Sequence, residues 1–236
     1  MGASLSAIKG FAAPETGEAF QRALALCQQI GETPQLFPVL AGLRLFYTTH
    51  GELQTSREIG EQLLRLAEST GDPGLILEAH YGLGTPLCYL GEFVSARAHL
   101  EQSIALYDSQ RQRRFLSGIG TMEAGVVARN QAAWALWNMG YPDQAVERIR
   151  EALNLARDIA HPSSLAYASM FGSAVHTWRG DAQAALELAD AVITLAREHG
   201  FPSWLATGIF FRGYALAAQG EEEEGIAQML EGDAAN

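Results

Sequence analysis

A short glycine-centred segment returns along this chain at nearly constant spacing, and this periodicity constrains the fold more than any other feature of the sequence. The central glycines are separated by 40, 49, 40 and 40 residues; they are Gly51, Gly91, Gly140, Gly180 and Gly220. A second series, in which proline follows closely, alternates with the first; its members begin at Gly31, Gly71, Ala160 and Gly200. The spacing of 49 residues means that one repeat carries nine additional residues.

The stretches between these segments have the apolar spacing of helices. In one of them Ala96, Leu100 and Ile104 return every four residues, which places them on one helical face. Glycine suits the C-terminal cap of the preceding helix, and proline suits the first turn of the next one. Each 40-residue unit is therefore predicted to be helix, turn, helix, turn. Because one helix pair cannot bury its apolar faces alone, successive pairs are predicted to stack.

Small and apolar residues follow a recognisable pattern in three repeats. In the second full repeat they are Leu83, Gly84, Leu87, Gly91, Phe93, Ala96, Leu100 and Ser103. In the next two repeats they are Ala133, Gly140, Ala145 and Ala152, then Ser173, Gly180, Ala185 and Val192. This pattern resembles the tetratricopeptide-repeat family, whose period is about 34 residues, so these repeats are similar to long-helix variants. Arg44 and Gly60, in the first full repeat, depart from the pattern.

The resemblance implies an all-α fold, a right-handed superhelical solenoid of antiparallel helix pairs. We expect a single domain over residues 1–236. It would comprise a partial repeat (1–30), repeats at about 31–70, 71–110, 111–159 with the nine-residue insertion, and 160–199, and an incomplete repeat (200–236). Since uncapped terminal repeats expose apolar stripes, we also expect self-association through these ends.

A second likeness is narrower and rests on local sequence. Its segments read KGFAAPE, GETPQLFP, AAWALW and GYPDQA, and they lie at Lys9–Glu15, Gly31–Pro38, Ala132–Trp137 and Gly140–Ala145. They resemble the C-terminal repeat region of bacterial multidomain signalling ATPases, which are often joined to nucleotide cyclase domains. This resemblance implies a role in bacterial signal transduction. The ATPase part itself is absent from this chain.

Motifs for catalysis, cofactors or metals are missing from the sequence. The one lysine, Lys9, does not follow a phosphate-binding glycine loop, and no nucleophile-elbow pattern occurs. The histidines form no His-Glu-x-x-His pair, and neither Cys27 nor Cys88 has a partner at ligand spacing. Glu221–Glu224 are better explained as a solvated helix start than as a catalytic pair. We therefore predict a protein that is not an enzyme and has no cofactor or metal.

Charge and composition exclude further partner classes. The formal net charge is −11, so a broad basic surface for nucleic acid is absent. No apolar run approaches the roughly 20 residues of a membrane-spanning helix, and the start of the chain does not resemble a secretory signal. Two cysteines are too few for a disulfide scaffold. The sequence therefore predicts a cytoplasmic protein that binds neither nucleic acid nor membranes.

The tetratricopeptide-repeat resemblance also implies a binding groove lined by the first helix of each pair. The residues that it places there are Tyr81, Tyr89, Asn130, Trp134, Trp137, Asn138, Met170, Trp178, Phe210 and Tyr214. Aromatic residues at helical spacing are often core residues, so we expect about half of the set to pack between helices. Tryptophan and tyrosine also dominate binding hot spots, and amides such as those of Asn130 and Asn138 can pair with a peptide backbone.

Two functions are consistent with these features. The first is a non-enzymatic helical-repeat scaffold that binds a protein or peptide, as a regulatory module of a bacterial signalling ATPase or cyclase system. The alternative is a sensor domain in which the aromatic groove holds a small molecule or a signal peptide. A broad shallow groove favours the first function, whereas a deep pocket lined by Trp134 and Trp178 favours the second.

Overall fold

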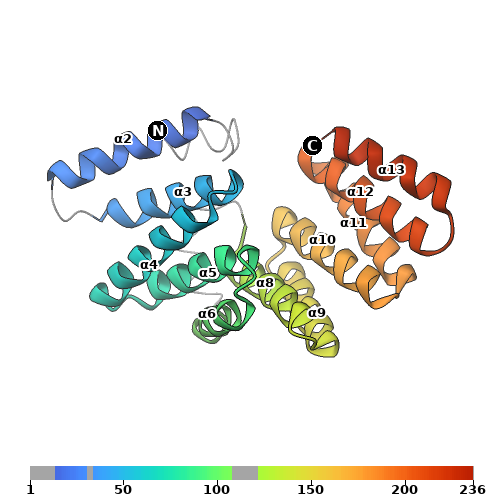
Figure 1. Ribbon diagram of the computed structural model, residues 1–236, viewed down its shortest axis with the longest axis horizontal. Coiled ribbons are helices and arrows are strands. Elements are labelled where there is room, and N and C mark those ends of the chain that lie inside the picture. Colours follow the sequence, from blue (N-terminus) through green and yellow to red (C-terminus); the bar gives the residue numbers. More distant parts are fainter. Residues whose placement is uncertain (1–13, 31–33, 108–121, 236) are drawn as a thin grey trace. The chain divides into compact units, whose positions relative to one another are not determined.

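The computed structural model describes residues 14–30, 34–107 and 122–235, and within them it contains eleven α-helices and no strand (Figure 1). In chain order the helices are α2 (Pro14–Ile30), α3 (Leu36–Thr49), α4 (Leu53–Thr70), α5 (Pro73–Tyr89), α6 (Phe93–Leu106), α8 (Ala124–Asn138), α9 (Pro142–Asp158), α10 (Pro162–Arg179), α11 (Ala182–His199), α12 (Pro202–Ala218) and α13 (Glu222–Ala234). The prediction of an all-α fold of successive helix pairs is confirmed.

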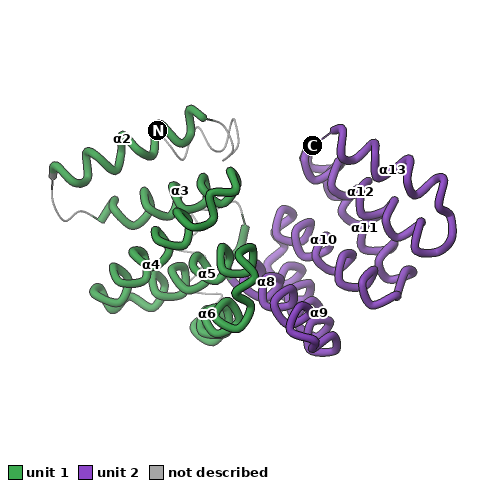
Figure 2. Tube along the Cα trace, in the orientation of Figure 1, with its two compact units in different colours: residues 1–124 green, residues 125–236 purple. Residues whose placement is uncertain are grey.

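The chain forms two compact units, Met1–Ala124 and Gly125–Asn236 (Figure 2). Unit 1 contains α2 to α6, and unit 2 contains α9 to α13 together with all but the first residue of α8. The predicted nine-residue insertion lies around residues 108–121, outside the described residues, as do Lys9 and the Gly31 turn. The pairing of helices predicted from the repeats occurs within each unit.

Turn chemistry sets the ends of the helices. Seven glycines at the predicted turns have positive φ: Gly51, Gly71, Gly91, Gly140, Gly180, Gly200 and Gly220. Proline occupies the first turn of α5, α9, α10 and α12. At the start of α5, Asp72 accepts hydrogen bonds from the N–H groups of Gly74 and Leu75, at 2.7 and 3.3 Å. The helix boundaries are thus determined by local residues, as the sequence predicted.

The turn before α10 departs from this rule, because alanine stands where the other turns have glycine. Ala160 has φ +51°, and it is the one described residue other than glycine with a positive φ. This conformation costs alanine roughly 1 kcal/mol, and the Ala160 side chain is exposed, so it contributes no core packing. We expect Ala160→Gly to raise the free energy of unfolding by about 0.5 kcal/mol, after the larger entropy of glycine in the unfolded chain is subtracted.

Urea unfolding of the intact chain tests this expectation. The matched control is Ala227→Gly, an exposed alanine inside α13 with ordinary helical neighbours. There the same substitution should lower stability by about 1 kcal/mol through helix propensity alone. If both substitutions lower stability, the left-handed turn at Ala160 is not strained.

The core of each unit forms where small residues let helices approach. In unit 2, Val126 and Leu136 of α8 pack with Ala145 and Ile149 of α9 and with Val175 of α10. In unit 1, the buried residues of α3, α4 and α5 form a comparable cluster: Phe37, Leu40, Leu63, Ala67 and Ala79. The small residues of the pattern that lie inside helices, such as Ala96 and Ala145, are buried, whereas its turn glycines are exposed.

Arg44, which departs from the repeat pattern, is accommodated by a local change in packing. Its side chain is buried, and its Cζ lies 5.6 Å from the ring centroid of Tyr81 on α5. The adjacent Gly82 leaves room for the guanidinium, since a Cβ there would lie 3.1 Å from Arg44 Nε. The first full repeat therefore replaces a small crossing residue by a buried cation stacked on an aromatic ring.

A pair of histidines joins α5 to α6. His80 Nδ1 and His99 Nδ1 lie 3.0 Å apart, so one ring donates a hydrogen bond and the other must accept it in an unprotonated state. Burial lowers the pKa of both side chains below 6.5, and the proximity of His99 lowers that of His80 further. The negative charge of Glu68 raises the pKa of His80, and that of Glu61 raises the pKa of His99, but burial has the larger effect on both.

This pair predicts that the chain loses stability in mild acid. Because the folded pKa values lie below the unfolded ones, the unfolded chain binds protons first, and the free energy of unfolding falls as pH decreases through and below 6.5. Urea unfolding at about pH 7.5 and about pH 5.5 measures the loss. We expect His80→Asn/His99→Asn to reduce the pH dependence and His199→Asn, at the end of α11, to preserve it. An unchanged pH dependence in the double variant would contradict this assignment.

Candidate functional site

The first helices of the pairs in unit 2 bring aromatic side chains together. The Trp137 ring on α8 and the Trp178 ring on α10 have centroids 5.7 Å apart, and their planes are tilted by 40°. Trp137 is half-buried and packs against the core of unit 2, whereas Trp178 is 38% exposed. The pair therefore has one ring held by the core and one ring presented to solvent.

A second row of rings continues across three helices. On α10, Tyr167 and Phe171 have centroids 4.8 Å apart. Phe171 meets Trp134 of α8 edge-on at 6.4 Å, and Tyr167 meets Trp204 of α12 edge-on at 5.9 Å. We call the full set the aromatic cluster; it consists of Trp134, Trp137, Tyr167, Phe171, Trp178 and Trp204.

Hydrogen bonds fix part of this cluster in place. The buried side chain of Gln131 on α8 donates from Nε2 to the Tyr167 hydroxyl at 2.8 Å. The exposed Asn138 donates from Nδ2 to the Trp134 carbonyl at 2.9 Å, one turn earlier in α8. The Tyr167 ring, held by its hydroxyl, loses little additional freedom when it contacts a ligand, whereas the Asn138 bond ends on backbone and holds no ring.

Asn130 differs from Asn138 in its surroundings. Its side chain is fully buried, and Nδ2 donates to the Val126 carbonyl at 3.0 Å. The structure therefore places the Asn130 amide in the interior of unit 2, whereas the Asn138 amide reaches solvent. Helical periodicity does not distinguish these two positions, because their burial depends on how α8 packs against its neighbours.

The other predicted groove residues lie on three different helices. Met170 on α10 is half-buried, and Phe210 and Tyr214 on α12 are both partly exposed. Tyr81 and Tyr89 belong to α5 in unit 1: Tyr89 is exposed, while Tyr81 is half-buried and burial raises the pKa of its hydroxyl. Unit 2 thus brings together Trp134, Trp137 and Trp178 of the predicted set.

The sequence prediction omitted Gln131, Tyr167, Phe171 and Trp204. A signal for three of them was present in the spacing of the aromatic residues. Phe171 follows Trp134 by 37 residues, and Trp204 follows Tyr167 by the same interval. This interval is one 40-residue repeat minus about one helical turn. These two contacts between neighbouring first helices therefore join residues that are offset by one turn in the repeat register, whereas Trp137 and Trp178, 41 residues apart, are nearly in register.

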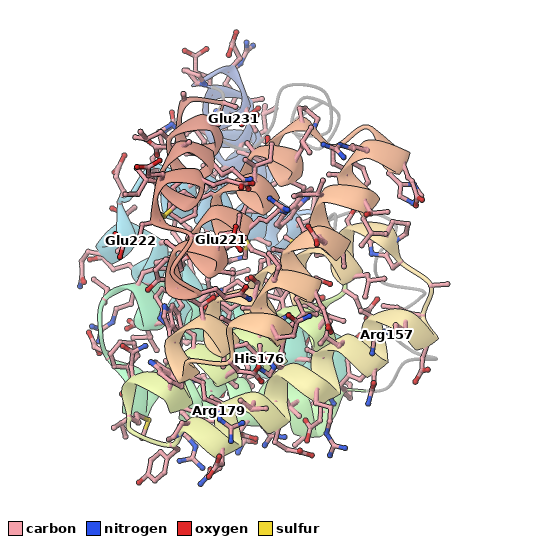
Figure 3. All side chains as sticks on the ribbon, turned by 90° about the vertical axis from the view of Figure 1, so that its right-hand side faces the viewer. Arg157, His176, Arg179, Glu221, Glu222 and Glu231 are labelled. Carbon is pink, nitrogen blue, oxygen red and sulfur yellow. The ribbon has the colours of Figure 1, made fainter. Side chains whose placement is uncertain are left out.

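Charged residues surround the end of α10 that carries Trp178. Arg179 Nη2 lies 3.1 Å from Asp143 Oδ1 of α9, and His176 Nδ1 lies 3.2 Å from Asp181 Oδ2. Figure 3 labels His176 and Arg179. Both contacts are at the surface, where such pairs contribute little to stability. They lie at the same end of α10 as the exposed Trp178 and supply polar groups there.

No group of three or more histidine, cysteine, aspartate or glutamate residues in residues 14–30, 34–107 and 122–235 is arranged to hold a metal ion. None of the helices described is both long enough and apolar enough to cross a membrane. Cys27 and Cys88 are buried and do not form a disulfide.

Comparison with known proteins identifies the fold. No family model and no curated protein matches the chain. Among solved structures, the chain is similar to a Rap protein complexed with Competence and Sporulation Factor, with a TM-score of 0.75 and 12% identity. That match covers 98% of this chain and 61% of the Rap chain, so this chain spans less than two thirds of its length.

Two other solved structures match over most of both chains. BtubC (BKLC) from P. vanneervenii has a TM-score of 0.68 and 13% identity, with 93% of this chain and 89% of that chain covered. The tetratricopeptide-like repeats of a kinesin light chain from Podosopora anserina, described there as putative, have a TM-score of 0.60 and 18% identity, with 87% and 97% covered. The fold is therefore that of tetratricopeptide-type helical-repeat proteins.

Proposed function

We propose that this chain is a non-enzymatic scaffold that binds a protein or peptide segment through the aromatic cluster of unit 2. The observation that carries the proposal is the Trp137–Trp178 pair, in which a core-held ring supports a ring that is 38% exposed. Aromatic side chains supply large contact areas at low entropic cost and are enriched in binding hot spots. The exposed amide of Asn138 and the Arg179–Asp143 pair supply polar contacts beside it.

The comparisons support the same class of function. The Rap protein that shares this fold was crystallised with Competence and Sporulation Factor, which shows that such a helical-repeat array can hold a ligand. The local likeness of AAWALW and GYPDQA to the repeats of bacterial signalling ATPases suggests the context. We place the chain in the bacterial cytoplasm as a regulatory or partner-binding module of such an ATPase or cyclase system.

A peptide-display selection on the intact chain tests the proposal. The peptide with the highest enrichment is synthesised, and its Kd is measured by fluorescence anisotropy. We expect Trp178→Ala to weaken binding by roughly 10-fold or more, as loss of a hot-spot ring does. Tyr141→Ala, which removes another exposed aromatic ring from the turn before α9, is the control and should leave the Kd nearly unchanged.

Three outcomes separate the possible functions. A selected peptide whose affinity falls only in Trp178→Ala supports the proposed site. Equal affinity in the intact chain and Trp178→Ala rejects the aromatic cluster as the site. If no peptide is enriched while small-molecule extracts raise the melting temperature, the chain is a small-molecule sensor instead.

A further inference from the structure

An apolar pair on α13 is unusually exposed. Ile226 and Leu230 are 51% and 66% exposed, and their spacing of four residues places them on the same side of the helix. Figure 1 shows α13 alongside α12, and the buried residues of α13, Gly225 and Gly232, face that neighbour. Ile226 and Leu230 are therefore not part of the contact that holds α13 to unit 2.

The positions on α11 that correspond to this face of α13 show which helix packs there. Moving back by 40 residues aligns Ile226, Leu230 and Asp233 with Leu186, Asp190 and Ile193 of α11. There Asp190 Oδ1 lies 3.0 Å from Arg212 Nε of α12. Ile193 also lies against α12, since a Cβ on Gly208 would be 2.9 Å from Ile193 Cγ1.

On α11, Asp190 and Ile193 of this face therefore contact the first helix of the next pair. The corresponding face of α13 is exposed, with Leu230 in place of Asp190 and Asp233 in place of Ile193, so it offers an apolar surface to one more helix. We call it the α13 stripe and define it by five residues: Glu222, Glu223, Ile226, Leu230 and Asp233.

The negative charge of α13 indicates which kind of helix can bind the α13 stripe. From residue 222 to residue 234, α13 carries five carboxylates and no lysine or arginine. Glu222 and Glu223 precede Ile226 by four and three residues, and Asp233 follows Leu230 by three, so carboxylates flank the apolar pair at both ends. Figure 3 shows Glu222 and Glu231 toward opposite ends of α13.

We propose that the α13 stripe binds an amphipathic α-helix of a partner protein, with apolar residues at its centre and arginine or lysine residues flanking them. This helix packs on α13 as α12 packs on α11, its apolar side chains covering Ile226 and Leu230. The flanking cations pair with Glu222, Glu223 and Asp233. The Arg212–Asp190 pair shows that an arginine of a first helix can pair with a carboxylate of the preceding second helix, although Asp190 itself is aligned with Leu230. Apolar contact supplies affinity, and opposite charge at the flanks supplies orientation and partner choice.

A second copy of the chain fits the stripe less well. The exposed apolar residue of α2 is Leu26, and the charged residues of that helix are Glu15, Glu18 and Arg22. This helix has a net charge of −1, counting two acidic residues and one basic residue, and the whole chain has −11. Association of two such acidic surfaces brings like charges together, which a basic partner helix avoids.

A display library of single helices tests the proposal on the full chain. Each helix has two leucines four residues apart, and the flanking positions are randomised. Counter-selection on Leu230→Ser removes helices that bind elsewhere, including at the aromatic cluster. We expect arginine and lysine to be enriched at the flanks over aspartate and glutamate. Absence of helices that prefer the intact chain, or enrichment of neutral or acidic flanks, overturns the proposal.

Variants of the chain then locate the contact. The Kd of the helix with the highest enrichment should rise about 10-fold or more in Leu230→Ser. Val94→Ser, which removes a 71% exposed apolar side chain from α6, should leave the Kd unchanged. In Glu223→Lys/Asp233→Lys the charge preference of the flanks should reverse. If sedimentation shows an intact dimer that Leu230→Ser dissociates, the occupant is a second copy and the proposal is wrong.

Discussion

Replacing Gly225 by alanine is expected to detach α13 from α12 and to lower the stability of unit 2 by about 3 kcal/mol. A Cβ at this position would lie 2.6 Å from the Ala217 backbone nitrogen and 2.6 Å from the Gly213 carbonyl oxygen. Backbone atoms within helices cannot move aside as a flexible side chain can, so the helices must separate. Glycine to alanine inside a free helix has the opposite effect, a gain of about 1 kcal/mol. The sign of the change is therefore diagnostic.

Hydrogen exchange along the chain measures where the stability is lost. In Gly225→Ala we expect faster exchange in α12 and α13, whereas α9 retains its protection. The control is Ala227→Gly, an exposed position two residues away that weakens helix propensity without altering the contact with α12. Slower or unchanged exchange of α13 in Gly225→Ala would show that the two helices are not held by this close approach.

The sequence predicted those features that depend on neighbouring residues. Gly140 and Gly180 end helices because a left-handed residue is needed there, and Pro142 and Pro162 begin helices because the first turn needs no N–H donor. These requirements are local, so the positions of the turns and the all-α fold follow from spacing alone.

The close approach of α12 to α13 depends on packing between two helices and was not predicted from the sequence. Gly213, Gly225 and Gly232 have helical backbones and no turn signal, and their importance comes from the approach of α12 to α13. Within a single helix, each of them indicates only low propensity. The close contact between these two helices is evident only when both backbones are placed.

The candidate binding residues were predicted in part for a similar reason. Helical spacing placed Trp134, Trp137 and Trp178 on first helices, where Trp137 contacts Trp178 and Trp134 contacts Phe171. It did not reveal that Asn130 is buried, because rotation of α8 against its neighbours decides which amide reaches solvent. The offset of one turn in the Trp134–Phe171 and Tyr167–Trp204 contacts also lies outside any pattern of a single helix.

Leu100→Ala in α6 is expected to lower the free energy of unfolding by about 2 to 5 kcal/mol, because Leu100 is fully buried and its loss leaves a cavity. Gly84→Ala in α5 is expected to cost about 1 to 3 kcal/mol for the opposite reason, overpacking. A Cβ on Gly84 would lie 2.6 Å from Leu100 Cγ. Gly84 and Leu100 thus fill one space at the crossing of α5 and α6.

The double variant Gly84→Ala/Leu100→Ala should therefore be more stable than the sum of the single losses predicts, by about 1 kcal/mol. The new methyl group enters the space that the leucine vacates. Gly84→Ala/Leu40→Ala is the control, because Leu40 belongs to the core cluster around α3 and α4, and its losses should add. Additive losses in the first pair would show that Gly84 and Leu100 do not share a space. For Gly225→Ala, no second substitution of a side chain is expected to restore stability, because the atoms that a Cβ would meet at 2.6 Å belong to the backbone of α12.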